Sequence, residues 1–118
     1  MKKTLLFVLA LIAVGCADAG QSAFCESLSD ELPLEDLRRC AEQGYTNAQF
    51  ILGRMYSDGE GVPEDDAEAV RWYRLAADQG FATSQHSLGV AYGGGFGVPV
   101  DLAQAHMWLD LAASQSSG

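Results

Sequence analysis

Few side chains of this sequence have the types and spacing that covalent chemistry requires. The two histidines are His86 and His106, and neither has an aspartate or serine at a spacing that predicts a catalytic pair. The three cysteines, Cys16, Cys25 and Cys40, are not spaced with histidine as in a zinc site. We therefore expect no catalytic residue, no metal site and no cofactor, and we interpret both histidines as ordinary helix residues.

Two loop stretches could in principle hold other ligands. Residues 64–66 read Glu-Asp-Asp but lack the regular series of oxygen ligands of a calcium loop. They are more simply interpreted as the charged start of a helix. Residues 93–97 read Gly-Gly-Gly-Phe-Gly, but they follow a predicted helix, whereas a phosphate-binding loop follows a strand. We expect them to form a flexible connection between helices.

The elements that position these residues come from a segment that occurs twice. Shifted by 36 positions, residues 41–76 match residues 77–112 at 17 positions. A period between about 20 and 50 residues is typical of stacked repeat proteins. The matched pairs include Gln49/Gln85, Gly53/Gly89, Tyr56/Tyr92, Pro63/Pro99 and Trp72/Trp108.

The first helix of each copy is predicted by its apolar spacing. In the first copy Ala48, Leu52 and Tyr56 recur every four residues, as on one face of a helix. Thr46 and Gln49 fit a capping box at the start of this helix.

The second helix is predicted to begin after Asp65, with Glu68 completing a capping box, and to end before Gly80. Gly53 lies inside the first helix, where glycine is unfavourable, so we expect a neighbouring helix to approach closely there. A single hairpin cannot bury the apolar stripes of both helices, and stacked hairpins can. We therefore interpret Trp72 as a core residue.

Four motifs in fixed order are similar to the Sel-one-like repeat (SLR), a relative of the tetratricopeptide repeat. Leu-Gly-x-x-Tyr, Gly-x-Gly-Val-Pro-x-Asp, Ala-x-x-Trp and Ala-Ala-x-x-Gly occur within residues 52–80, and most of them again within residues 88–113. The resemblance implies an all-α protein, an α/α solenoid whose hairpins form a right-handed superhelix that serves as a protein–protein interaction scaffold. Some relatives are secreted bacterial proteins with disulfides, and a few are linked with penicillin binding. One departure is that Leu109 takes the place of Tyr73.

The repeat divides the chain into four predicted segments. Residues 1–19 form a signal peptide, because Lys2 and Lys3 precede an apolar run of about ten residues. That run is shorter than the roughly 20 residues of a membrane-spanning helix. Residues 20–44 form an N-terminal capping half-unit, and residues 45–80 and 81–116 are the two full repeats.

Two cleavage sites compete in the signal peptide. Ala-Val-Gly before Cys16 resembles a lipobox, which would make Cys16 the lipidated N-terminus. Ala-Asp-Ala at residues 17–19 resembles an ordinary cleavage site, which would release a soluble protein. Cys25 and Cys40 remain in both cases, and an even number of cysteines in an exported protein favours a disulfide. Two buried free thiols are the alternative.

The charge of the chain limits the classes of partner. Its formal net charge is −9, and both lysines lie in the predicted signal peptide. An acidic surface repels phosphate groups, so nucleic acid is not an expected partner. We expect contact with a membrane only through the lipid anchor at Cys16. The simplest interpretation of the acidity is solubility.

The predicted binding surface is the concave side of the solenoid, which the first helices line. Positions that differ between the copies are better candidates than those that recur, although each of them could instead pack between hairpins. The candidate contact residues are Phe50, Ile51, Arg54, His86, Ser87 and Val90.

The sequence thus favours a non-catalytic interaction scaffold or adaptor of the bacterial cell envelope, periplasmic, secreted or lipid-anchored. Its partner would be another protein or an extended peptide. The alternative is a protein that binds or hydrolyses β-lactams or peptidoglycan fragments, which would need an acylable serine such as Ser84 or Ser87. Self-association through the C-terminal hairpin is a third hypothesis.

Overall fold

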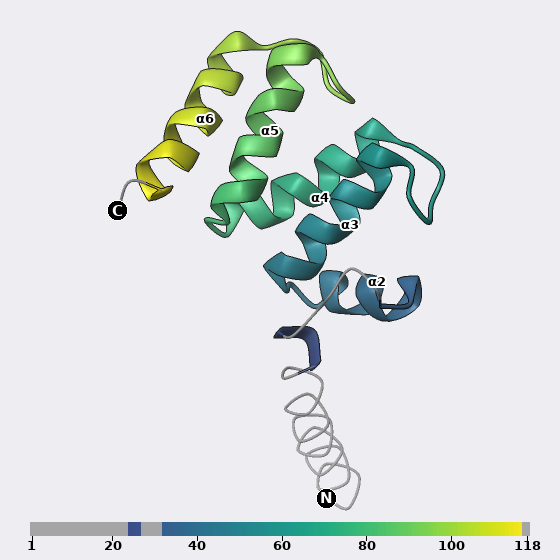
Figure 1. Cartoon of the computed structure of the whole chain (residues 1–118). Coiled ribbons are helices and arrows are strands. Elements are labelled where there is room, and N and C mark those ends of the chain that lie inside the picture. Colours follow the sequence, from purple (N-terminus) through teal and green to yellow (C-terminus); the bar gives the residue numbers. More distant parts are fainter. Residues whose placement is uncertain (1–23, 27–31, 117–118) are drawn as a thin grey trace, which may run out of the picture.

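A computed structural model describes residues 24–26 and 32–116, so the predicted signal peptide and Cys16 lie outside the described residues. A helical turn at 24–26 comes first. The helices that follow are α2 (Leu34–Glu42), α3 (Thr46–Asp58), α4 (Asp66–Asp78), α5 (Ala82–Gly94) and α6 (Leu102–Ser116). Helices α3 and α4 form one hairpin and α5 and α6 a second, with α2 before them (Figure 1). The predicted all-α repeat solenoid is confirmed.

The two hairpins use the same signals to end one helix and start the next. Gly59 ends α3 in the left-handed conformation with φ 70°, and the glycine at the equivalent place ends α5 with φ 73°. Asp65 and Asp101 each accept a hydrogen bond of 3.1 Å from the backbone N–H three residues on. The predicted N-cap at Asp65 is confirmed. The Glu68 carboxylate bonds to Arg71 at 2.7 Å instead of completing the box.

The capping box predicted at Thr46 and Gln49 is wrong. The N-cap of α3 is Tyr45, and no side chain caps this helix start. Gln49 is 3% exposed, and its Nε2 donates 3.1 Å to the carbonyl oxygen of Ala41 near the end of α2. The Ala41 carbonyl also accepts 3.1 Å from the N–H of Gly44, and a carbonyl oxygen can accept two bonds, so the buried Gln49 amide is paired there.

The equivalent glutamine of the second repeat makes the same contacts, and together they give two sets that we call the glutamine brackets. In each bracket a buried glutamine donates to a carbonyl at the end of the preceding helix and accepts from a glutamine at the C-terminal end of the following helix. The distances are 3.1 and 3.0 Å in the first bracket and 3.2 and 2.8 Å in the second. The brackets are Ala41–Gln49–Gln79, across α2, α3 and α4, and Ala77–Gln85–Gln115, across α4, α5 and α6.

Apolar side chains between the helices form two core clusters, one around each tryptophan. Trp72 belongs to the cluster between α2, α3 and α4, and Trp108 to the cluster between α4, α5 and α6. The interpretation of Trp72 as core is confirmed. A Cβ atom at Gly53 would lie 2.8 Å from the Tyr73 ring, so only glycine lets α4 approach α3 this closely. This is the close approach that the sequence predicted at Gly53.

The N-terminal turn is attached to α2 by a disulfide. Cys25 and Cys40 are bonded, with their Cα atoms 5.6 Å apart, and each is 2% exposed. The predicted disulfide is confirmed, and the alternative of two buried free thiols is wrong. Closing a loop of this length limits the unfolded chain and stabilises the fold by about 3 kcal/mol.

Candidate functional site

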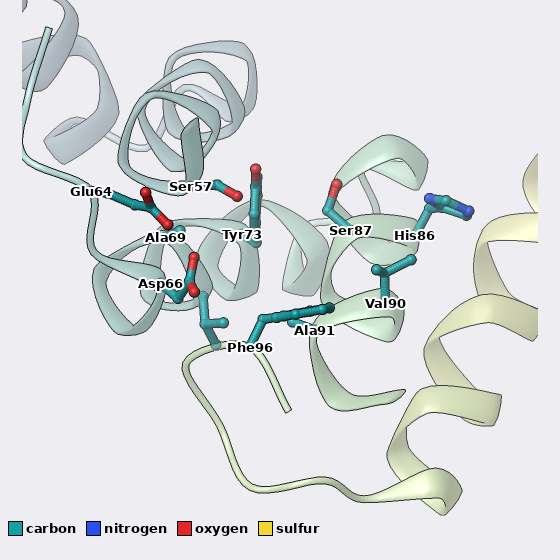
Figure 2. A pocket seen from close by; sticks show the side chains of 11 residues that line it. Ser57, Glu64, Asp66, Ala69, Tyr73, His86, Ser87, Val90, Ala91 and Phe96 are labelled. Carbon is teal, nitrogen blue, oxygen red and sulfur yellow. The ribbon is translucent and has the colours of Figure 1, made fainter. Parts of the chain in front are cut away.

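A groove of about 550 Å³ lies between the α3/α4 hairpin and α5. Its volume falls in the range of roughly 300–1,000 Å³ that is usual for ligand pockets. Figure 2 shows side chains from both hairpins pointing into it. The lining residues are Ser57, Glu64, Asp66, Ala69, Val70, Tyr73, His86, Ser87, Val90, Ala91 and Phe96.

Tyr73 of α4 stands in the middle of the groove, between the two hairpins (Figure 2). The Phe50 ring packs against it with ring centroids 5.9 Å apart, and Phe50 also meets Phe81 edge-on at 5.6 Å. Burial raises the pKa of the Tyr73 hydroxyl, and a hydrogen bond with Ser57 opposes this shift only in part. At neutral pH the groove therefore contains a neutral phenol that is held in place by aromatic packing.

The two ends of the groove differ in chemistry. Glu64, in the loop before α4, and Asp66, in the first turn of α4, bring carboxylates to one end (Figure 2). Val90 of α5, which is 46% exposed, brings an apolar side chain to the other end. Phe96, which is 52% exposed, reaches between the two from the α5–α6 loop beside Asp66. The groove can accordingly contact a cationic group and an apolar group together.

The loop that carries Phe96 is held against the start of α4. Gly97 has φ 76°, and a Cβ atom there would clash with the backbone of Asp66 and Ala67. Only glycine permits this approach, because the positive φ and the contact both disfavour a side chain. The loop that was expected to be a flexible connection thus packs on α4 and presents Phe96 to the groove.

The structure brings half of the predicted contact residues together. His86, Ser87 and Val90 all line the groove from α5 (Figure 2). Phe50 lies behind the groove against Tyr73 and does not line it.

The other two predicted contact residues lie on α3, outside the groove lining. Ile51 is 8% exposed and belongs to the core cluster around Trp72. Arg54 is half-buried, and its positive charge lowers the pKa of Tyr73. Arg54 therefore contributes to the electrostatics of the groove without being part of its wall.

The two serines considered for acylation differ in access. Ser84 is completely buried, and its Oγ atom has no hydrogen-bond partner. A reagent cannot reach it unless α5 moves. Ser87 is partly buried in the groove wall, and His86 is its chain neighbour. Adjacent residues of a helix do not face one another, so His86 is poorly placed as a base for Ser87.

Sequence reasoning did not select four of the groove residues, Glu64, Asp66, Tyr73 and Phe96. A signal was available in each case, because all four differ from their counterparts 36 positions away. The predicted contact residues all lie on the first helix of a repeat, α3 or α5. The groove also takes residues from the second helix of the preceding repeat and from the loop.

Neither a metal cluster nor a membrane span was found in the part of the chain that the structure describes. Within residues 24–26 and 32–116, no three His, Cys, Asp or Glu side chains gather as metal ligands would. Each helix in this region is too short or too polar to span a bilayer.

Known proteins similar to this chain share its repeat. The Sel1 repeat model matches residues 46–81 and 82–117. The chain is 44% identical over 43 residues to an exopolysaccharide production negative regulator of Rhizobium leguminosarum bv. viciae, covering 36% of this chain and 16% of the relative.

Two solved structures superpose with the hairpins. One is a protective antigen present in uropathogenic Escherichia coli strains, with an SLR fold (TM-score 0.67, 52% identity, 69% of this chain and 17% of that chain). The other is a Sel1 repeat protein from Oxalobacter formigenes (TM-score 0.68, 42% identity, 69% of this chain and 61% of that chain).

This chain spans less than two thirds of the length of each of these three proteins. Sel1 repeats generally form non-catalytic protein-interaction folds. The two matched repeats account for more than half of the sequence, and the helical hairpins described above are those of the solved relatives. The chain belongs to the Sel1 repeat family.

Proposed function

We propose that this Sel1 repeat chain is a non-catalytic adaptor of the bacterial cell envelope that binds another protein, or an extended peptide of it, in the groove between α4 and α5. One observation carries the proposal. The groove exposes apolar side chains, Val90 and Phe96, at positions where the two repeats differ. Residues that recur build the solenoid, and exposed residues that do not recur are available for a specific partner.

The location in the envelope has separate support. The disulfide between Cys25 and Cys40 is typical of an oxidising compartment such as the periplasm. The predicted signal peptide gives the route, by release after residue 19 or by lipidation at Cys16. A relative named as a protective antigen and another named as a regulator are consistent with a surface or regulatory adaptor.

Affinity capture from envelope extract tests this function with two matched variants. Val90 and Met107 are 46% and 44% exposed, on α5 inside the groove and on α6 outside it. Val90→Arg places a long charged side chain in the groove, and Met107→Arg makes the same change elsewhere. We expect a partner that wild type and Met107→Arg retain and that Val90→Arg loses. Equal capture by all three proteins would place the binding surface elsewhere, and no specific capture would argue against an adaptor.

A further inference from the structure

We infer that the groove takes an extended peptide segment in which an arginine or lysine and an apolar residue stand two positions apart. The inference rests on the proposed function, because it assigns the chemistry of the partner for the same groove. It is argued from the carboxylates and the exposed apolar side chains of the groove, together with the net negative charge of the chain.

The acidic end supplies the contact for the basic side chain. Glu64 is exposed and Asp66 half-buried, and both carboxylates lie on the groove wall beside Tyr73 (Figure 2). The charge of Asp66 raises the pKa of Tyr73, as does that of Asp58, whereas Arg54 lowers it. Negative charge therefore exceeds positive charge around the phenol. A guanidinium or ammonium group would bond to the carboxylates and could also lie against the aromatic ring.

The apolar end supplies the contact for the second side chain. The exposed Val90 side chain lies across the groove from the carboxylates, and the exposed Phe96 ring lies between Asp66 and Val90 (Figure 2). In an extended peptide, residues two positions apart point to the same side. A basic residue and an apolar residue with one residue between them can thus enter the groove together, with the middle side chain turned outward.

The acidic and apolar ends are specific to this place in the chain. The positions that correspond to Glu64 and Asp66 in the second repeat are Val100 and Leu102, and the position that corresponds to Phe96 in the first is Glu60. The glutamine brackets and the capping aspartates recur, whereas these groove residues do not. Variation of exposed side chains at positions of one repeat is what a surface for a specific partner predicts.

Charge also decides between a partner and a second copy of the chain. The chain carries 16 acidic and 7 basic residues, so two copies repel each other. The described arginines are already engaged. Arg38 donates to Tyr56, Arg71 pairs with Glu68, and Arg74 lies over the Tyr92 ring. A segment from a different and more basic protein is the better occupant.

Titration of the expressed protein with defined peptides, followed by amide chemical shifts in NMR spectra, tests the inference. The probe is the capped peptide Ser-Gly-Arg-Ser-Leu-Gly-Ser, and the control peptides carry Glu in place of Arg or Ser in place of Leu. A short peptide binds weakly, with a Kd on the order of 1 mM, so shifts are followed to about 10 mM. We expect saturable shifts at the groove amides of α4 and α5 for the probe, and at least tenfold weaker binding of both control peptides.

Paired variants identify the carboxylates. Glu64→Gln with Asp66→Asn removes two charges from the groove, and Glu35→Gln with Asp110→Asn removes two exposed charges from α2 and α6. We expect the first pair to weaken binding of the probe about tenfold, because a charge-assisted hydrogen bond is lost, and the second pair to change it less than twofold.

Four results would overturn the inference. The first three are the absence of saturable shifts with the probe peptide, binding of the Glu peptide as tight as that of the probe, and equal weakening of probe binding by both variant pairs. The fourth is a dimer in sedimentation that Val90→Arg abolishes, which would make a second copy the occupant. Capture of a partner that depends on Val90, combined with no binding of the probe, would leave the adaptor function standing and refute the basic–apolar segment alone. Absence of both would refute the two together.

Discussion

The glutamine brackets should contribute measurably to stability, and the second one permits a clean test. Gln85 is 4% exposed, donates 3.2 Å to the carbonyl of Ala77 and accepts 2.8 Å from Gln115. Gln85→Met keeps an unbranched side chain of similar length and removes both hydrogen bonds. The substitution therefore isolates the polar contribution from that of packing.

The expected cost follows from the partners that remain. The carbonyl of Ala77 also accepts 2.9 Å from the N–H of Gly80, so it is not left unpaired in the variant. The amide of Gln115 is exposed and can bond to water. With no buried group left without a partner, the loss is that of two ordinary hydrogen bonds, each about 1 kcal/mol. We expect Gln85→Met to lower the free energy of unfolding by about 2 kcal/mol, with a fall in Tm of about 10 °C.

Urea denaturation followed by circular dichroism measures this, with Gln115→Met as the matched variant. Gln115→Met breaks only the 2.8 Å bond but leaves the buried Oε1 of Gln85 without its donor, so it should cost about 1–3 kcal/mol. The double variant should cost no more than Gln85→Met alone, because the bond between the two glutamines is already lost. A loss below about 0.5 kcal/mol for Gln85→Met, or strict additivity in the double variant, would refute the bracket as a stabilising unit.

Three further predictions follow from single features of the structure. Ser84→Ala should raise the free energy of unfolding by about 1 kcal/mol, because it removes a buried hydroxyl that has no partner; a loss of similar size in urea would contradict this. Replacing Cys25 and Cys40 with alanine, which buries no hydroxyl, should cost at least about 3 kcal/mol in the same assay, and an unchanged midpoint would show that the disulfide contributes little. Burial raises the pKa of Tyr73 above its unfolded value of about 10, so the stability that the neutral phenol contributes is present below pH 10 and is lost as the pH rises above it. Tyr73→Phe should therefore reduce the loss of stability at alkaline pH. An unchanged loss would assign the alkaline effect to other groups.

The repeat made the fold predictable. The hairpins were predicted from a 36-residue period, from the glycines at the helix ends and from the capping aspartate at Asp65. In the structure both repeats end the first helix at a glycine and cap the second with an aspartate. Local signals were less reliable where a side chain had a choice of partners. Gln49 had the right spacing for a capping box at Thr46, but only the neighbouring helix offered it a carbonyl inside the core. Such a contact across α2 and α3 depends on packing, which spacing along one helix does not define.

The groove was predictable only in part, for a geometrical reason. Three of the predicted contact residues, all on α5, line the groove, and they were selected because they vary between the repeats on a predicted first helix. Phe50 and Ile51 vary between the repeats as well, but their side chains pack inside the fold: Phe50 contacts Tyr73, and Ile51 belongs to the core cluster around Trp72. Phe96 was missed because a glycine-rich loop suggests mobility, whereas the contact of Gly97 with α4 positions this one.

Site-specific photocrosslinking in living cells tests the central claim most directly. A photoreactive phenylalanine analogue replaces Phe96, which is 52% exposed in the groove, or Met107, which is 44% exposed outside it. The adaptor function predicts a discrete, partner-sized adduct from position 96 and none from position 107. Adducts from both positions with equal yield, or from position 107 alone, would contradict the assignment of the groove as the binding surface.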